Sequence, residues 1–171
     1  MPFLYSALYV LALGIASHFI GEAIPRCWFS YSRFPYRTYG WEKNGKFYKK
    51  LHIDAWKDHM PDMSRFMKDM VPKRVGKAPH SRDVWILVAE TCRAEIVHLG
   101  LCVLSPVIWL FWKNPIGIVL SVLVILCNIP FILIQRYNRP TLVVLARRLE
   151  AREERKRNAN LDSVGEHGGR T

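Results

Sequence analysis

The chain has 171 residues, half of them hydrophobic, and a formal net charge of +11 at pH 7. This length suits a single domain. The apolar residues are concentrated in runs long enough to cross a bilayer, which excludes an ordinary soluble fold. The basic residues lie mainly between and after these runs, so they indicate membrane topology and attraction to anionic lipid headgroups rather than nucleic-acid binding.

The first apolar run, residues 3–20, carries no formal charge and is predicted to be a transmembrane helix. A cleaved signal peptide is the alternative. Against it, no Lys or Arg precedes the run, and the run is longer than the usual apolar region of a signal peptide. We therefore expect the first run to be retained as a span.

Residues 24–80 form a polar segment that we expect to lie on the membrane surface. Its beginning is crowded with Trp, Tyr, Phe and Arg, which prefer the headgroup layer. Apolar residues at helical spacing predict a short surface helix over 46–58 and another amphipathic stretch over 63–70. Residues 72–79 read as a basic linker.

The second run, 84–112, is predicted to follow an N-cap at Ser81, with Asp83 in the first turn and a kink at Pro106. At roughly 43 Å it exceeds the hydrocarbon core, so its first turns should project into the interface.

The third run, 116–134, is predicted to continue as an Arg-rich amphipathic helix over 141–157. The Gly- and Asn-containing tail, 158–171, is expected to be disordered. The sequence therefore predicts an all-α integral membrane protein with three transmembrane helices plus interfacial amphipathic helices, in a single membrane domain over 1–157.

Basic residues predict the orientation of this domain in the cell membrane. Segment 21–83 carries 14 Lys and Arg against 7 Asp and Glu, and segment 135–171 carries 9 against 5. The link between the second and third runs is only residues 113–115. The positive-inside rule then places both basic segments in the cytoplasm and the N-terminus outside.

The densest polar cluster within an apolar run comprises Glu90, Arg93, Glu95 and His98. On a helix, the two glutamates and His98 share one face. Ionisable groups inside a span are costly and often mark a functional site, and a carboxylate that orients an imidazole makes it a candidate general base. The alternatives are an Arg93–Glu90 pair that eases insertion and simple interhelical contacts by the others.

A second cluster lies at the end of the third run. Arginine is well suited to binding phosphate or carboxylate, although snorkelling anchors would look similar. Asn128, about two turns deeper, would place an amide inside the bundle. A third and weaker group lies in the surface segment and could equally be a solvated turn. The candidate substrate-binding residues are Arg93 of the first cluster, Asn128 with Gln135, Arg136, Asn138 and Arg139 of the third run and its end, and Trp56, Lys57 and Asp62 of the surface segment.

The cysteine and histidine patterns indicate no metal site. The four cysteines form no C-x-x-C pair, so neither a disulfide framework nor a zinc site is predicted. Glu95-x-x-His98 has the spacing of a di-iron ligand pair, but such sites need a second Glu-x-x-His. We predict no metal and no cofactor.

With these motifs in their order, the chain resembles the membrane-bound glycosyl-4,4'-diaponeurosporenoate acyltransferases of staphyloxanthin-type carotenoid biosynthesis. The resemblance covers roughly residues 40–150. It rests on Trp56-Lys-Asp with Pro61-Asp62, on Glu90-Thr-Cys-Arg-Ala-Glu95 with His98, and on Asn128-Ile-Pro130 with Gln135-Arg-Tyr-Asn-Arg-Pro140. It implies transfer of a fatty acyl chain to a sugar hydroxyl of a glycosylated C30 carotenoid.

Our hypothesis is a membrane O-acyltransferase in which His98 is the general base, Glu95 orients it, and Glu90 with Arg93 fixes the helix face. Arg136 and Arg139 would hold the anionic part of the donor, such as the phosphates of acyl-CoA as co-substrate. The expected partners are membrane lipids, a lipid-soluble acceptor, the acyl donor and no nucleic acid, with homo-oligomers or pathway-enzyme complexes as further options. The alternatives are a non-catalytic membrane subunit or lipid-binding scaffold, and a small transporter with a proton relay.

Overall fold

The computed structural model describes residues 2–60 and 80–168, and this part of the chain is all-helical. Three helical segments are long and apolar enough to cross a membrane, which confirms the predicted fold class. They are α1 (Pro2–Ala23), the combination of α4 (Ser81–Leu104), the 3-10 helix η5 (Ser105–Val107) and α5 (Ile108–Trp112), and α6 (Pro115–Gly168).

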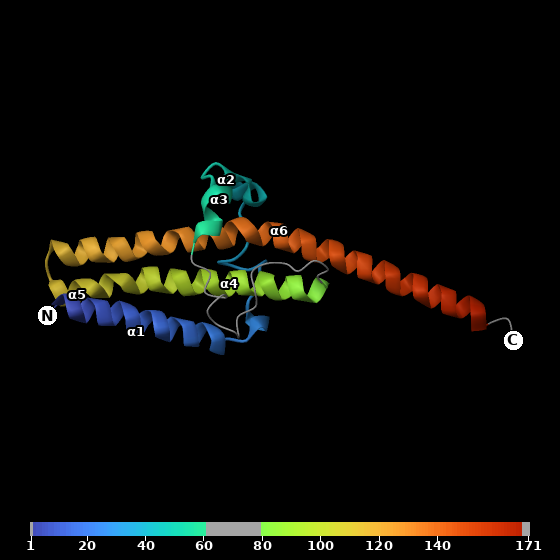
Figure 1. The fold of residues 1–171 in the computed structure, drawn as a ribbon, viewed down its shortest axis with the longest axis horizontal. Helices are drawn as coiled ribbons and strands as arrows, with labels where there is room; N and C mark the ends of the chain where they lie inside the picture. The colour runs from blue at the N-terminus through green and yellow to red at the C-terminus, as the bar shows by residue number, and fades with distance from the viewer. Residues whose placement is uncertain (1, 61–79, 169–171) are drawn as a thin grey trace.

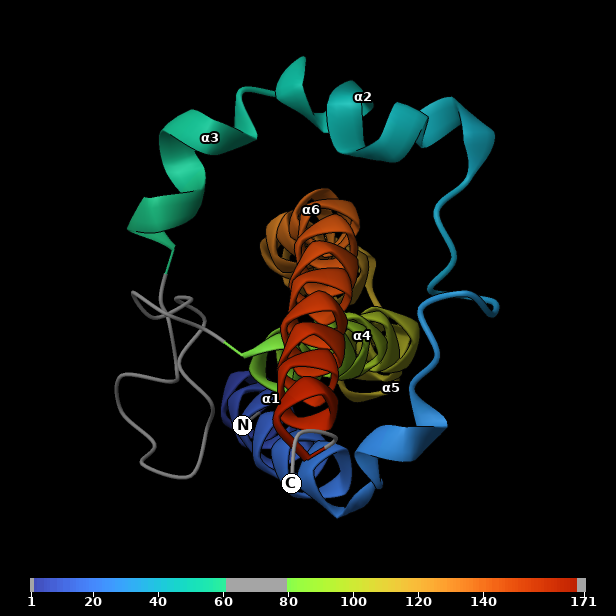
Figure 2. The same cartoon turned by 90° about the vertical axis from the view of Figure 1, so that its right-hand side faces the viewer.

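The three segments lie side by side with alternating direction, α4–α5 between α1 and α6 (Figure 1). The polar segment that follows α1 arches around α6, and Figure 2 shows it crossing from one side of the bundle to the other. This segment contains η1 (Arg26–Trp28), η2 (Gly40–Gly45), α2 (Lys46–Lys49), α3 (Ile53–Trp56) and η3 (Lys57–His59). It therefore brings residues distant in sequence against the middle of α6.

Polar contacts tie α1 to the second span at the end where the chain begins. Tyr9 donates its hydroxyl to the Leu104 carbonyl at 2.9 Å, and the Trp112 indole donates to the Ser6 hydroxyl at 2.8 Å. Near the other end of α1, a Cβ added at Gly21 would lie 3.0 Å from a Val97 methyl carbon. A small residue is therefore needed there for α1 to approach α4 closely.

The second span is broken where Pro106 was expected to kink it, because η5 separates α4 from α5 there. The tight turn that follows has Lys113 in the left-handed region, with φ 49°. Asn114 then accepts the Ile116 N–H through its side chain at 3.0 Å, which caps the start of α6.

α6 is longer than the sequence analysis expected. Its 54 residues correspond to about 80 Å of helix, well beyond a hydrocarbon core of about 30 Å. The helix bends near its midpoint, where Pro140 lies (Figure 1). Residues 158–168, for which we expected disorder, continue this helix.

Two local predictions were wrong. The expected helix over 46–58 is divided into α2 and α3, because His52 adopts φ 51°, a left-handed conformation that a continuous helix cannot contain. The N-cap of α4 is His80 rather than Ser81, with the His80 N–H donating to Asp83 at 3.3 Å. The predicted stretch 63–70, the linker 72–79 and Asp62 lie outside the described residues.

Candidate active site

A buried ionic cluster joins α4, α6 and the arching segment. Its two carboxylates, Glu42 and Glu95, are each 1% exposed, and its arginines are Arg136 and Arg139, the latter 2% exposed. Two positive and two negative charges compensate one another, which is the condition under which charges are tolerated in a low-dielectric interior.

Arg136 is the centre of this cluster. Its guanidinium donates to Glu95 at 2.9 Å, to Glu42 at 2.5 Å and to the Pro35 carbonyl at 2.6 Å. It also lies over the Tyr39 ring, 5.3 Å from the centroid. Arg136 therefore fastens the arching segment to both long helices.

Arg139 is held in the same way one turn further along α6. It donates to the other Glu95 oxygen at 2.5 Å, to the hydroxyl and carbonyl of Thr91 at 2.9 and 3.0 Å, and to the Tyr36 carbonyl at 2.7 Å. We expected Arg136 and Arg139 to bind an anionic donor. That role stays a prediction; in the structure both guanidiniums bind Glu95 and backbone carbonyls.

Two tyrosines of the arching segment line this cluster. Tyr48, 1% exposed, donates its hydroxyl to Glu42. Burial, and then this hydrogen bond, raise the pKa of Tyr48 above the usual tyrosine value. Burial likewise raises the pKa of Tyr36, with the charge of Glu95 adding to the effect. Both hydroxyls thus remain neutral donors at physiological pH.

Glu90 and Arg93 belong to a separate ionic cluster at the end of α1. Arg93 donates to Glu22 at 2.6 Å and lies 3.2 Å from Glu90, while Arg26 donates to the other Glu90 oxygen atom at 2.7 Å. The Arg93–Glu90 pair predicted from the sequence is therefore present. It forms part of a four-residue network that fixes α1 and the start of the arching segment on α4.

His98 is paired with Asn128 on α6. Its Nδ1 lies 2.7 Å from Asn128 Oδ1. The Asn128 amide nitrogen donates to the Val124 carbonyl at 2.8 Å, which turns the amide oxygen toward the imidazole. Because that oxygen can only accept, Nδ1 must carry the proton, and the basic lone pair of the neutral ring lies on Nε2.

The His98 ring is also held from one side by an aromatic contact. It stacks on Phe131, with centroids 4.6 Å apart and an interplanar angle of 9°. His98 follows Glu95 by one helical turn, so the imidazole lies directly next to the ionic cluster, toward the apolar half of the bundle. A defined tautomer in a fixed ring is what a general base requires.

The remaining candidate binding residues lie on α6 and in the arching segment. Gln135 is buried and Asn138 half-buried on α6. The Trp56 indole donates to the Leu51 carbonyl at 3.1 Å, and Lys57 pairs with Asp54 at 3.0 Å over the Tyr137 ring. Tyr137 of α6 donates to Asp54 of α3 at 2.7 Å, so these contacts lie where α3 meets α6, and the binding role of Trp56 and Lys57 stays a prediction.

Glu42 is the residue that the sequence analysis missed. It is a single acid in an aromatic, basic stretch, and its partner Arg136 is 94 positions away. A weak sequence signal was present: an acid placed shortly before the turn residues Asn44 and Gly45. That pattern by itself does not distinguish a surface turn from a buried ion pair.

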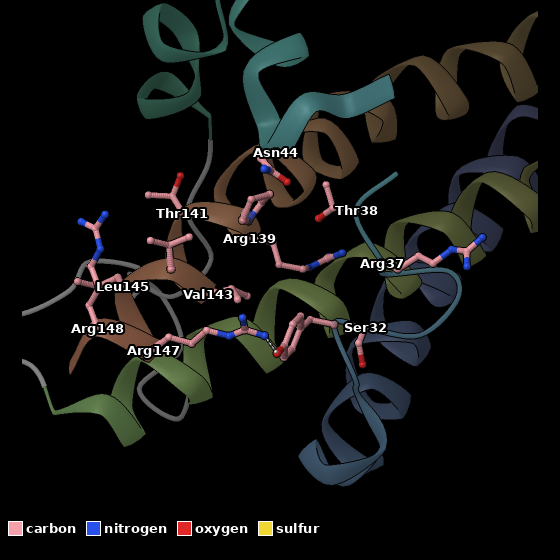
Figure 3. Close-up of a pocket in the computed structure, with 13 residues that line it drawn as sticks. Ser32, Arg37, Thr38, Asn44, Arg139, Thr141, Val143, Leu145, Arg147 and Arg148 are labelled. Atoms are coloured by element: carbon pink, nitrogen blue, oxygen red, sulfur yellow. Dashed lines mark hydrogen bonds between the residues drawn. The ribbon is translucent and has the colours of Figure 1, made fainter. Parts of the chain in front are cut away.

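A cavity of about 820 Å³ opens beside the ionic cluster, between α6 and the arching segment. Figure 3 shows Arg139 and Arg147 among the residues that line it, and Arg147 donates to the Tyr31 hydroxyl on the facing segment. Its volume lies within the range of about 300–1,000 Å³ that is usual for small-molecule sites.

The chain was compared with known proteins. A profile of the family described as glycosyl-4,4'-diaponeurosporenoate acyltransferase matches residues 27–148. A protein of that name from Staphylococcus aureus strain bovine RF122 / ET3-1 is 31% identical over 149 residues, covering 85% of this chain and 87% of the relative. The protein of the same name from strain MRSA252 is 30% identical over the same shares. No solved structure matches. The matched region includes the ionic cluster and the His98–Asn128 pair.

Proposed function

The chain belongs to the glycosyl-4,4'-diaponeurosporenoate acyltransferase family, and from this premise we propose that its acyl-transfer site is at His98. The acceptor implied by the family is a glycosyl carotenoid, and the reaction forms an ester between a fatty acyl group and a sugar hydroxyl. The observation that carries the proposal is the pair between His98 and Asn128, at 2.7 Å, next to the buried ionic cluster.

The proposed chemistry needs one proton acceptor. The sugar hydroxyl oxygen attacks the acyl carbonyl carbon while its proton passes to His98 Nε2. Asn128 accepts from Nδ1–H throughout, so the imidazolium that forms remains oriented. With a thioester donor, the carbon–sulfur bond then breaks, and the thiolate takes the proton back from Nε2.

The location of His98 suits an amphiphilic acceptor. The sugar must reach the interface, while the polyene needs an apolar environment. Large apolar side chains on α1 and α6 are exposed, among them Phe19, Ile118, Leu123 and Leu126. In a bilayer these surfaces face lipid, and a polyene can lie along them in place of acyl chains. The sugar would then lie at the level of His98 and Glu95.

Glu95, Glu90 and the arginines act as positioning residues in this proposal. Glu95 holds α6 against α4 through Arg136 and Arg139, and thereby fixes the turn from which His98 projects. Glu90 and Arg93 fix α1 on the same helix. Orientation follows the basic residues, with the N-terminus outside and residues 21–83 and the C-terminal part of α6 in the cytoplasm.

The test is His98→Ala, with His18→Ala as the matched control in α1. Acyl transfer per membrane-inserted molecule should fall about 10²- to 10⁴-fold for His98→Ala, since general-base catalysis typically contributes that much. The control should behave as wild type. If the protein were instead a non-catalytic scaffold, His98→Ala would change abundance or partner binding. Near-wild-type turnover per molecule would rule out the proposed base and make His59 the next candidate.

A further inference from the structure

The cavity beside the ionic cluster has the charge of an anion-binding site. Four of the thirteen described residues that line it are arginines, and none of the thirteen is acidic. Apolar side chains, Val143 and Leu145 among them, line another part of it. An opening with one sign of charge and a partly apolar wall favours an anionic, amphiphilic occupant.

Three of the four cavity arginines differ from the fourth, Arg139, which also belongs to the ionic cluster. Arg139 is neutralised by Glu95. By contrast, no described carboxylate lies within salt-bridge distance of Arg37, Arg147 or Arg148. Arg147 donates to the Tyr31 hydroxyl at 2.9 Å, and Arg37 lies over the Tyr39 ring at 5.1 Å. Among the described residues these three guanidiniums therefore have no salt-bridge partner, although the charge of Glu150 acts on Arg147 from a longer distance.

Two acidic residues of α6 near the cavity accept hydrogen bonds from α4. Glu150 accepts from the Trp85 indole at 3.1 Å, and Glu153 accepts from the backbone and hydroxyl of Ser81 at 2.9 and 2.6 Å. Both carboxylates thus dock α4 on α6. The Tyr31 ring stacks on Trp85, with centroids 5.4 Å apart, so the cavity wall opposite Arg147 is held in place.

The distance from this cavity to His98 is set by α6. Asn128, the partner of His98, precedes Arg139 by 11 residues and Arg147 by 19, which along a helix is about 16 Å and about 28 Å. An occupant that binds its anionic end near Arg147 needs a long, flexible arm to bring a reactive group to His98. Coenzyme A thioesters have this form: phosphates and a nucleotide at one end, a pantetheine arm, and the acyl carbonyl at the other end.

We propose that this cavity binds the phosphorylated nucleotide end of a coenzyme A thioester that serves as the acyl donor, with Arg147 and Arg148 contacting its phosphates. The assignment rests on the proposed function. The pantetheine arm passes Arg139 toward His98, and the cytoplasmic side of the bundle gives this water-soluble donor access.

The test uses the full-length protein in lipid nanodiscs and two donors with the same acyl chain. One donor is the coenzyme A thioester, and the other is the acyl-pantetheine thioester, which lacks the nucleotide. The variant is the double substitution Arg147→Gln and Arg148→Gln. Its matched control, Arg155→Gln with Arg157→Gln, removes the same charge from exposed positions of the same helix. The selectivity, the ratio of kcat/KM for the two donors, should fall at least tenfold in the variant and stay unchanged in the control.

Equal loss of selectivity in variant and control, or no loss in either, would overturn the assignment. So would transfer by the wild type from phosphatidylglycerol vesicles and not from either thioester, since the cavity would then bind a lipid headgroup. If the wild type uses no donor at all, the proposed function fails. Equilibrium dialysis with labelled coenzyme A still tests the cavity in that case: binding that the variant loses and the control keeps supports the site, and no binding by the wild type refutes it.

Discussion

Arg136 and Glu42 stand 94 positions apart in the chain and form an ion pair of 2.5 Å, with the Glu42 side chain 2% exposed. This pair closes the arch of the polar segment over α6. Glu95 on α4 binds the same guanidinium from the other side, at 2.9 Å. Three parts of the chain therefore meet at one arginine, and Glu95, one of its partners, precedes His98 by one turn of α4.

Glu42→Gln is expected to destabilise the protein strongly. The substitution keeps the shape of the side chain but leaves Arg136 with one carboxylate fewer in a buried setting. The loss should be about 3 kcal/mol, the lower end of the cost of removing one partner of a buried ion pair. Thermal melting in detergent measures it. Glu154→Gln, the same change at an exposed position of α6, should stay within about 0.5 kcal/mol of wild type. Equal melting temperatures for the two variants would contradict this role of Glu42.

The fold was largely predictable from the sequence because hydropathy alone determines which segments can cross a bilayer. The three spans and the break near Pro106 follow from runs of apolar residues and one imino acid. The division of the surface helix at His52 could not be predicted in this way. His52 adopts a φ of 51°, a backbone conformation that glycine usually indicates in a sequence, and this position is not a glycine.

The site was only partly predictable. Most of the residues were found, since ionisable groups in a span are conspicuous, and the Arg93–Glu90 pair was predicted, but Glu42 and the ion pairs of Glu95 were not. Helical geometry places Glu95 and His98 on one face, and it predicted their contact. That contact stays a prediction, whereas the partners on α6, the arginines for Glu95 and Asn128 for His98, could not be predicted. Such pairings depend on the rotation of α6 about its axis, which local periodicity does not determine.

We expect residues 150–153 to contribute to the stability of the protein, and the end of α6 to be dispensable. A truncation after Asn160 removes exposed residues such as Leu161 and should keep both membrane level and activity. A truncation after Leu149 also removes Glu150 and Glu153, which accept hydrogen bonds from Trp85 and Ser81. Each lost bond should cost about 1 kcal/mol, visible as a lower melting temperature. If the protein truncated after Asn160 lost activity at normal abundance, the removed tail would have a further role.

The orientation of the spans is expected to follow the positive-inside rule. With Cys27 replaced by Ser, a cysteine at Lys113 should react with a membrane-impermeant maleimide in intact cells. A cysteine at Lys49 or Lys77 should react only after permeabilisation. The reason is that 14 basic residues lie in segment 21–83, whereas Lys113 is the only one in the short turn between the second and third spans. Labelling of the Lys49→Cys protein in intact cells would reverse the topology.

Asn128 separates the proposed chemistry from a purely structural role for His98. Its amide oxygen accepts from Nδ1–H and so selects the tautomer with the basic lone pair on Nε2. Asn128→Leu removes that acceptor, and both tautomers then become populated. Loss of tautomer control has a large effect on kcat where an imidazole is the base, so we expect acyl transfer per inserted molecule to fall at least tenfold. Asn128→Asp keeps an acceptor opposite Nδ1 and should retain more of the rate than Asn128→Leu.

A structural role predicts the reverse order, because a carboxylate half-buried between helices destabilises the bundle more than leucine does. Product per membrane-inserted protein, measured by lipid mass spectrometry for both variants, decides between the two: higher activity in Asn128→Leu than in Asn128→Asp would rule out the proposed base–amide pair.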